Sequence, residues 1–109
     1  MQLHATRYES EQSLAQNPPI IILHGLFGSS RNWHPIAQAL SDKYTVYALD
    51  LRNHGKSPHD NIMDYPHMAR DVLTFLENEL GQKEITPVTI IAHSMGGKAA
   101  MWLALTRPE

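Results

Sequence analysis

The sequence predicts an α/β fold, with helices flanking a mostly parallel sheet, from three observations. Short apolar runs at residues 19–23, 45–49 and 88–91 alternate with longer segments of helical periodicity. β-Branched residues are frequent in these runs, as is typical of buried parallel strands. Each run passes directly into polar or glycine-containing residues. Strands that alternate with helices imply right-handed βαβ units, and therefore a mostly parallel sheet.

Four elements are expected in the first half of the chain. They are, in order, a strand at 3–8, a strand at 19–23, a helix at 32–40 and a strand at 45–49. A polar connection and Pro18-Pro19 separate the first two strands. The apolar residues of the helix recur at helical spacing and are expected to form one stripe that packs on the sheet. This stripe consists of Trp33, Ile36, Ala37 and Leu40.

The second half predicts two further helices with a strand between them. The first helix starts near Asp64 and Pro66 and stops at Gly81. Its apolar stripe consists of Met68, Val72, Phe75, Leu76 and Leu80. The strand at 88–91 is expected to be buried on both faces. The last helix spans 98–106 and ends before Pro108, and its Trp102, like Phe75, is expected to face the core or the sheet.

The most informative segment joins the last strand to the last helix and reads Ala92-His93-Ser94-Met95-Gly96-Gly97. A sharp strand-to-helix turn displays a nucleophilic serine at its apex, and it requires small residues two positions before and after the serine. Ala92 and Gly96 satisfy this requirement, and Gly97 extends the small surface. A serine in such a turn is commonly a helix cap. The loops that follow residues 19–23 and 45–49 favour the nucleophile.

Backbone N–H groups near this turn are candidates for stabilising an oxyanion. The Met95 N–H lies at the start of the last helix, where free N–H groups and the helix dipole favour negative charge. The glycines of the loop after residues 19–23 let that loop pass close to the turn, and the Leu26 N–H is the predicted second donor. Phe27 is its neighbour, and Phe27 and Trp33 are candidates for lining an acyl-binding pocket.

Three polar residues follow the strand at 45–49 and invite a metal hypothesis. Asp50, Arg52 and His54 lack metal-ligand spacing, so a loop braced by an internal Asp50–Arg52 pair is the favoured interpretation and no metal is predicted. His24 is expected to be a structural histidine that braces the oxyanion loop. Together with Ser94, His24 and Asp50 lie just past strand ends, where α/β sheets place their functional sites.

Three blocks, in this order, resemble the α/β-hydrolase superfamily, and within it the small bacterial YbfF-type carboxylesterases and acyl-CoA thioesterases. The blocks are His24-Gly25-Leu26-Phe27-Gly28-Ser29, the segment Asp50 to Pro58, and His93-Ser94-Met95-Gly96-Gly97-Lys98. The segment Asp64 to Asp71 resembles this branch as well. The match extends from about residue 18 onward. It implies the N-terminal portion of a single α/β-hydrolase domain, truncated after residue 109.

The resemblance implies a serine hydrolase without a cofactor. Ser94 would be the nucleophile, with the N–H groups of Met95 and Leu26 as oxyanion donors. The family's acid and histidine follow the serine in chain order, but residues 95–109 contain no histidine and no aspartate. None of the seven histidines occupies the general-base position, so the isolated chain is expected to be weakly active or inactive.

The composition limits the classes of binding partner and the cellular location that are expected. A net charge of -2 gives no electrostatic case for nucleic acid or an anionic membrane surface, so a small-molecule ester or thioester is expected. The chain has no cysteine and no apolar run long enough to span a bilayer. Residues 1–7 lack a signal-peptide pattern, and a cytoplasmic location is expected. An exposed edge at the strand before Ser94 is expected to meet a missing C-terminal half or a second copy.

Three functions remain open at this stage. The first is hydrolysis of short-chain carboxylic esters or thioesters through an acyl-enzyme on Ser94. The second keeps the fold but changes the acceptor or the bond, as in an acyltransferase, a perhydrolase or a C–C bond hydrolase. The third is a catalytically inactive fragment that acts as an interaction module.

Overall fold

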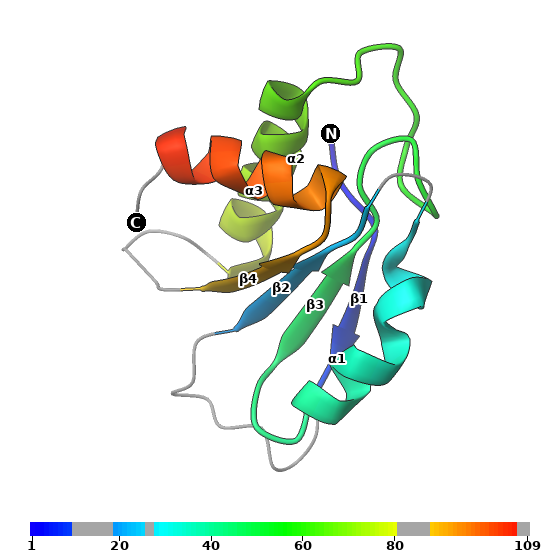
Figure 1. Cartoon of the computed structure of the whole chain (residues 1–109), viewed down its shortest axis with the longest axis vertical. Helices are drawn as coiled ribbons and strands as arrows, with labels where there is room; N and C mark the ends of the chain where they lie inside the picture. The colour runs from blue at the N-terminus through cyan, green and yellow to red at the C-terminus, as the bar shows by residue number, and fades with distance from the viewer. Residues whose placement is uncertain (10–18, 26–27, 81–87, 107–109) are drawn as a thin grey trace.

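A computed structural model describes residues 1–9, 19–25, 28–80 and 88–106, and it contains a four-stranded sheet with helices on both faces (Figure 1). The sheet order is β1-β3-β2-β4. The strands are β1 (Ala5–Tyr8), β2 (Ile20–Leu23), β3 (Val46–Leu49) and β4 (Thr89–Ala92). β2 pairs in parallel with β3 and β4, whereas β1 is antiparallel to β3. The prediction of a mostly parallel sheet is confirmed.

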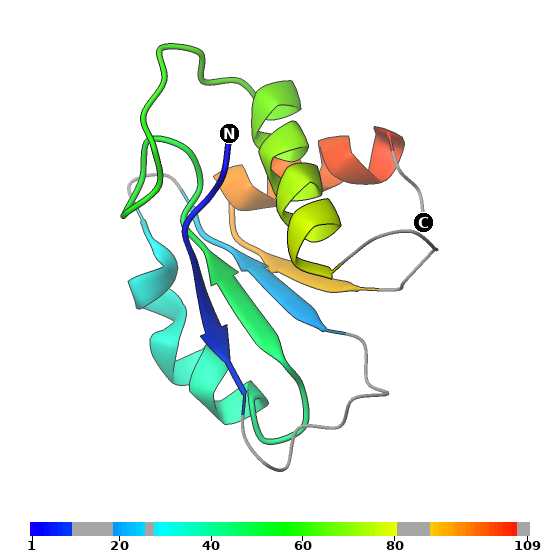
Figure 2. The ribbon, with the colours of Figure 1, turned by 180° about the vertical axis from the view of Figure 1, so that it is seen from behind.

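The helices divide between the two faces of the sheet (Figures 1 and 2). One turn of 3-10 helix, η1 (Ser30–Trp33), leads into α1 (His34–Leu40) on one face. On the other face α2 (Tyr65–Leu80) and α3 (Met95–Thr106) pack against each other. Helices on both faces explain why the central strands are apolar along their whole length.

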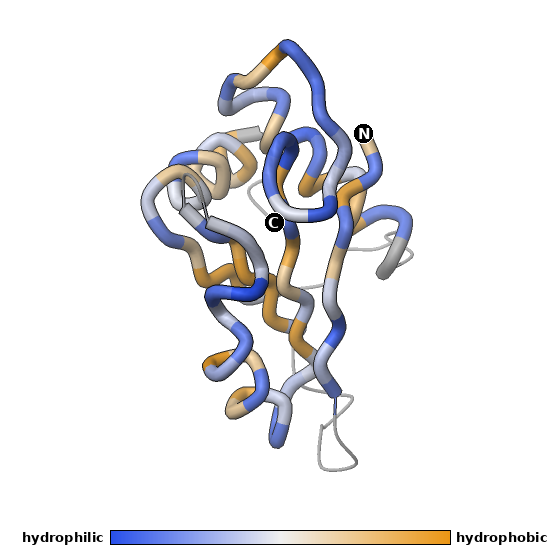
Figure 3. Tube along the Cα trace, turned by 90° about the vertical axis from the view of Figure 1, so that its right-hand side faces the viewer, coloured by the Kyte–Doolittle hydropathy of each residue, from blue (hydrophilic) through white to orange (hydrophobic). Residues whose placement is uncertain are grey.

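Alternation along the strands produces two apolar cores. Successive residues of a strand point to opposite faces, so Ile20 and Ile22 pack toward α1 while Ile21 and Leu23 pack toward α2 and α3. All four residues of β2 are buried, and so are all four of β3. Figure 3 shows apolar residues concentrated in the interior of the sheet, where the central strands lie, and many polar residues along the loops.

The expected elements are all present, with small differences at their ends. Each strand begins or ends within two residues of its predicted bounds. The last helix begins at Met95 rather than at residue 98, because Gly96 and Gly97 adopt helical geometry despite their low helix propensity. The helix expected at 32–40 begins as η1 and becomes α-helical only at His34.

Three predictions of buried residues are wrong. In each case the place of the residue in the fold, and not its apolar character, decides whether it is buried. β4 is half-exposed instead of buried on both faces, since it lies at the edge of the sheet. Ile36 is 47% exposed because α1 buries Ala37 against the strands instead. Trp102 is 44% exposed because the buried stripe of α3 runs through Met95, Ala99 and Leu103. Phe75 is buried in the core, as predicted.

Candidate active site

The carboxyl ends of the three parallel strands meet at one edge of the sheet. His24 directly follows β2, Asp50 directly follows β3, and Ser94 comes two residues after β4. The prediction that these three residues follow strand ends is therefore confirmed. Ser94 is exposed, whereas His24 and Asp50 are buried. This edge of the sheet therefore combines an exposed serine with two buried polar side chains.

Ser94 occupies the apex of a sharp strand-to-helix turn. Its backbone φ is 51°, a left-handed value that residues other than glycine adopt uncommonly and at some cost in strain. β4 ends at Ala92, and α3 begins at Met95. The turn therefore has the geometry expected of a nucleophile elbow, in which a strained serine is displayed between a strand and a helix.

The glycine two residues after the serine is required by close packing. A Cβ on Gly96 would lie 2.6 Å from the His24 carbonyl oxygen and 2.7 Å from the Leu23 carbonyl oxygen. Both contacts are with backbone at the end of β2, so neither can move aside. A Cβ on Gly97 would meet nothing within 4 Å, which limits the steric requirement to the first of the two glycines.

One of the two predicted oxyanion donors, the Met95 N–H, lies at the N-terminus of α3. Met95 is the first residue of α3, and the first N–H groups of a helix have no acceptor within the helix. Two of the predicted site residues, Leu26 and Phe27, lie outside the described residues. Next to them, the Gly28 N–H donates to the Gly25 carbonyl at 3.0 Å.

His24 is a buried histidine whose two ring nitrogens both form hydrogen bonds. Its Nε2 accepts from the Leu51 N–H at 3.0 Å, and its Nδ1 lies 2.7 Å from the Gly25 carbonyl oxygen. Burial is the main reason that the pKa of His24 is lowered, with the nearby His54 acting in the same direction. The Gly25 carbonyl and Asp50 partly oppose this lowering of the pKa. A neutral, bracing histidine agrees with the sequence interpretation.

Asp50 is a buried carboxylate that accepts backbone hydrogen bonds from two loops. The Ser30 N–H donates to it at 2.7 Å and the Lys56 N–H at 3.1 Å. These bonds hold the pKa of Asp50 below its ordinary value although burial works in the opposite direction. Asp50 thus links the loop after β2 to the loop after β3.

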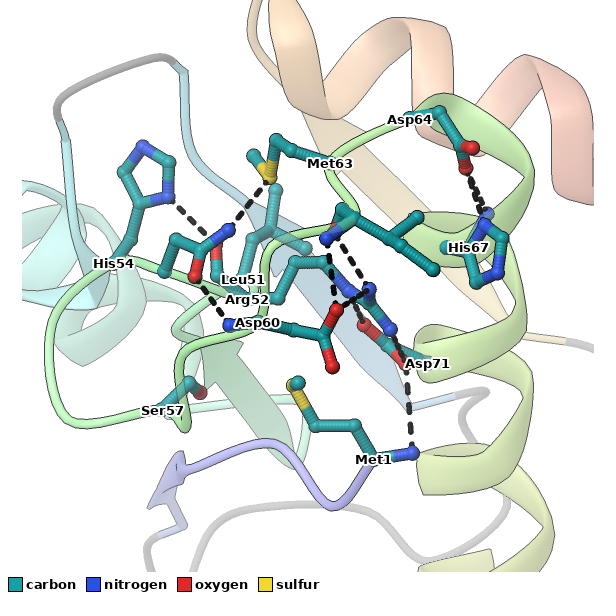
Figure 4. A network of polar contacts seen from close by, with 12 residues as sticks. Met1, Leu51, Arg52, His54, Ser57, Asp60, Met63, Asp64, His67 and Asp71 are labelled. Atoms are coloured by element: carbon teal, nitrogen blue, oxygen red, sulfur yellow. Dashed lines mark hydrogen bonds and ion pairs between the residues drawn. The ribbon is translucent and has the colours of Figure 1, made fainter.

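The predicted internal Asp50–Arg52 pair is wrong, because Arg52 pairs with Asp71 of α2 (Figure 4). The two bonds of this bidentate pair measure 2.6 Å and 3.0 Å, and both side chains are buried. Arg52 also donates to the Ile62 carbonyl, and the pairing with Asp71 raises the pKa of Arg52. Sequence reasoning missed Asp71, although a carboxylate directly beside Val72 in an apolar helix stripe signals a buried partner.

A hollow of about 400 Å³ lies between the loop after β2 and the residue before the serine. Trp33, Ile36 and His93 are among its lining residues, together with the glycines of the loop. The rings of Trp33 and His93 lie 6.5 Å apart. The structure therefore places the predicted pocket residue Trp33 beside the turn that carries Ser94.

Other described histidines bond to partners away from Ser94. The side chains of His34, His54 and His67 contact Tyr8, the Arg52 carbonyl and Asp64, respectively. Within the described ranges no group of histidine and acidic side chains could hold a metal ion. Among those same residues, no helix is long and apolar enough to cross a membrane.

The sheet order, the elbow and the buried loops together define the α/β-hydrolase class. Residues 18–109 match the family model described as alpha/beta hydrolase fold, and the chain belongs to this family.

Particular relatives support the esterase branch to which the sequence motifs point. The chain is 48% identical over 113 residues to an "sn-1-specific diacylglycerol lipase ABHD11" of Xenopus tropicalis, a match covering 97% of this chain and 34% of that protein. It is 42% identical over 97 residues to "Esterase YbfF" of Escherichia coli (strain K12), covering 89% and 37%. The solved "Marine microorganism esterase" superposes with a TM-score of 0.86 at 42% identity, covering 98% of this chain and 38% of that one. The chain spans about a third of the length of the curated relatives it matches.

Proposed function

We propose that this chain carries the nucleophile of a serine hydrolase that cleaves short-chain carboxylic esters or acyl thioesters. The observation that carries the proposal is the exposed Ser94, held at a φ of 51° between β4 and α3. A strained, exposed serine at the start of a helix fits attack on a carbonyl, because the helix N-terminus favours the negative charge that develops. An ordinary helix cap needs neither the strain nor the glycine packing behind it.

The proposed reaction has two steps. The Ser94 hydroxyl attacks the acyl carbon while a general base takes its proton, and the alcohol or thiol leaves with that proton. Water then attacks the acyl-enzyme and releases the acid and free Ser94. The N–H groups of Met95 and Leu26 would bind the oxyanion in both steps. The base and the acid that orients it would come from residues other than these 109, in keeping with the greater length of the relatives.

The names of the relatives support an ester as the bond that is cleaved. A protein named a diacylglycerol lipase and two proteins named esterases are between 42% and 48% identical to this chain. The hollow beside Trp33 supports an acyl group as the part of the substrate that is bound. A small-molecule substrate and a cytoplasmic location are parts of the same proposal.

Covalent labelling tests this proposal. The chain is incubated with a fluorophosphonate probe, with and without imidazole as a substitute base, and turnover of short-chain p-nitrophenyl esters is measured alongside. We expect labelling that Ser94→Ala abolishes and that imidazole accelerates. Ser41→Ala is the matched control, because Ser41 follows α1 and its hydroxyl donates to the Gln38 carbonyl. Equal labelling of the Ser94→Ala chain, or a folded chain that is never labelled, would contradict the proposal and favour an inactive interaction module.

A further inference from the structure

His24, the residue directly after β2, connects the loop after β2 with the loop after β3 and with the serine turn. The Nε2 atom of His24 receives a hydrogen bond from the Leu51 N–H. A backbone N–H can only donate, so Nε2 must be unprotonated and the ring proton must reside on Nδ1. The Nδ1–H therefore donates to the Gly25 carbonyl at 2.7 Å. The bond from Leu51 requires the neutral ring, and the two bonds together fix this one tautomer.

The acceptor of the Nδ1–H bond also accepts a second hydrogen bond, from the other described end of the same loop. The Gly25 carbonyl receives the Gly28 N–H in addition to the His24 ring. The far end of the same loop is fastened by the bond from the Ser30 N–H to Asp50. The loop after β2 is thus held at its start by His24 and at its end by Asp50, and both attachments lead to the loop after β3.

This fastened loop abuts the serine turn. The His24 carbonyl oxygen occupies space that a Cβ on Gly96 would enter, and a Cβ on Gly25 would lie 2.7 Å from Nδ1 of His93. The His93 N–H donates to the Leu23 carbonyl at 3.1 Å. A shift of the backbone at His24 and Gly25 would therefore be transmitted directly to the residues on both sides of Ser94.

We propose that His24 is a positioning residue for the Ser94 turn, and that it ties the loop after β2 to Leu51 of the loop after β3 only while its ring is neutral. A protonated ring carries a hydrogen on both nitrogens, so it would oppose the Leu51 N–H instead of accepting from it. Protonation would keep the Nδ1–H bond to Gly25 but break the bond from Leu51. The loop after β2 would then lose one of its two attachments to the loop after β3, and Ser94 would react more slowly at acidic pH. This inference rests on the proposed function, since it assigns His24 a role in serine reactivity.

The surroundings of the ring favour the neutral form. His24 is 1% exposed, and the ring of His54 lies 5.0 Å away, so a second positive charge there would repel a protonated His24. Asp50 is the one nearby carboxylate among the described residues that acts on His24. Its oxygens accept from Ser30 and Lys56 instead of from the ring. His93, across Gly25, adds a third titratable ring near the loop.

The first test reads the hydrogen bonds without using activity. Nitrogen and amide-proton NMR of the whole chain should show a His24 ring protonated at Nδ1 only. The amide signals of Leu51 and Gly28 should move together in one transition as the pH is lowered. Matching NMR spectra of His24→Gln should lack that transition. A proton on Nε2 at neutral pH, or amide signals that stay fixed while His24 titrates, would overturn the inference.

The second test measures the rate of fluorophosphonate labelling as a function of pH. We expect His24→Leu to slow labelling about 10-fold to 100-fold at neutral pH, somewhat less than the loss of an oxyanion donor costs. His24→Gln, which can still accept from Leu51, should recover part of the rate and abolish the decline at acidic pH. The control His67→Leu makes the same change at a histidine whose side chain is 43% exposed and pairs with Asp64, and it should leave the rate unchanged. Circular dichroism verifies that each variant is folded.

The outcomes separate this inference from the proposed function. If Ser94 is labelled and a folded His24→Leu chain reacts at the full rate with an unchanged pH profile, the positioning role is wrong while the hydrolase proposal stands. If Ser94 is never labelled but the Leu51 and Gly28 signals follow the protonation of His24, the hydrolase proposal fails. In that second case the assigned influence on serine reactivity fails with it.

Discussion

β2 and β4 are neighbouring parallel strands of similar composition, yet they are buried to different extents. Their residues face one another in register, with Ile22 opposite Ile91. All four residues of β2 are buried, whereas the residues of β4 are exposed or half-buried. β2 has a strand on each side, and β4 has one on a single side among the described strands. Burial is thus decided by the place of a strand in the sheet and not by its apolar content.

The segments that follow these two strands differ in the same direction. The loop after β2 begins at the buried His24 and is fastened by hydrogen bonds to the loop after β3. The turn after β4 presents the exposed Ser94. A fixed polar frame next to an exposed, strained side chain is the arrangement that a reactive serine needs, because the frame holds the geometry while the serine meets the substrate.

The largest expected effect on stability tests the difference in burial between β2 and β4. Ile22→Ala removes a side chain that is 1% exposed, and it should lower the free energy of unfolding by about 2–5 kcal/mol. Ile91→Ala removes the half-buried partner in register and should cost about 1–2 kcal/mol. Urea unfolding of both variants gives the two values. Equal losses would show that β4 is as deeply buried as β2 in solution.

Substitutions at Gly96 and Gly97 test the contact between the end of β2 and the serine turn. Gly96→Ala should lower the free energy of unfolding by about 1–3 kcal/mol, because the new Cβ meets the backbone at Leu23 and His24. Gly97→Ala makes the same change where space is open, and it should raise that free energy by about 0.5–1 kcal/mol. Thermal unfolding and Ser94 labelling check both variants. Similar melting temperatures for the two would contradict the close packing of Gly96.

The smallest expected effect concerns the pH dependence of the loop after β2. The pKa of His24 is lowered by folding, so the unfolded chain binds this proton more readily than the folded chain does. Stability from His24 is therefore complete above the ordinary histidine pKa of about 6.5 and is lost as the pH falls below it. The free energy of unfolding should decrease between about pH 7 and pH 5, and His24→Gln should reduce this decrease. A decrease of the same size in His24→Gln would assign the effect to other histidines.

The local pattern predicted most of the fold. Apolar runs such as Ile20–Leu23 and the helical stripe through Met68, Val72 and Phe75 identify their elements because strand and helix periodicity depend on neighbouring residues only. The same reasoning located the turn at Ser94, since small residues two positions before and after the serine are part of the local motif, although the backbone that Gly96 meets belongs to Leu23 and His24. It could not find the partner of Arg52, because Asp71 lies nineteen positions away and on another element.

The exposed fraction of a side chain was the weakest point of the sequence reasoning. Ile36 and Trp102 lie in helices with apolar stripes, and periodicity alone admits either of two adjacent positions to the core. Which position is buried depends on the rotation of the helix against the sheet. That rotation is set by packing partners such as Ala37 and Leu103, which come together only when the chain folds.

The sequence by itself determined the class of fold, the order of strands and helices, and the strained serine turn, because each follows from spacing and from residue types a few positions apart. Tertiary structure alone decided the pairing of Arg52 with Asp71, the tautomer of His24 and the exposure of Ile36. Each of these depends on groups that are distant along the chain. Their electrostatic environment and their burial arise only when the loops and strands are packed together.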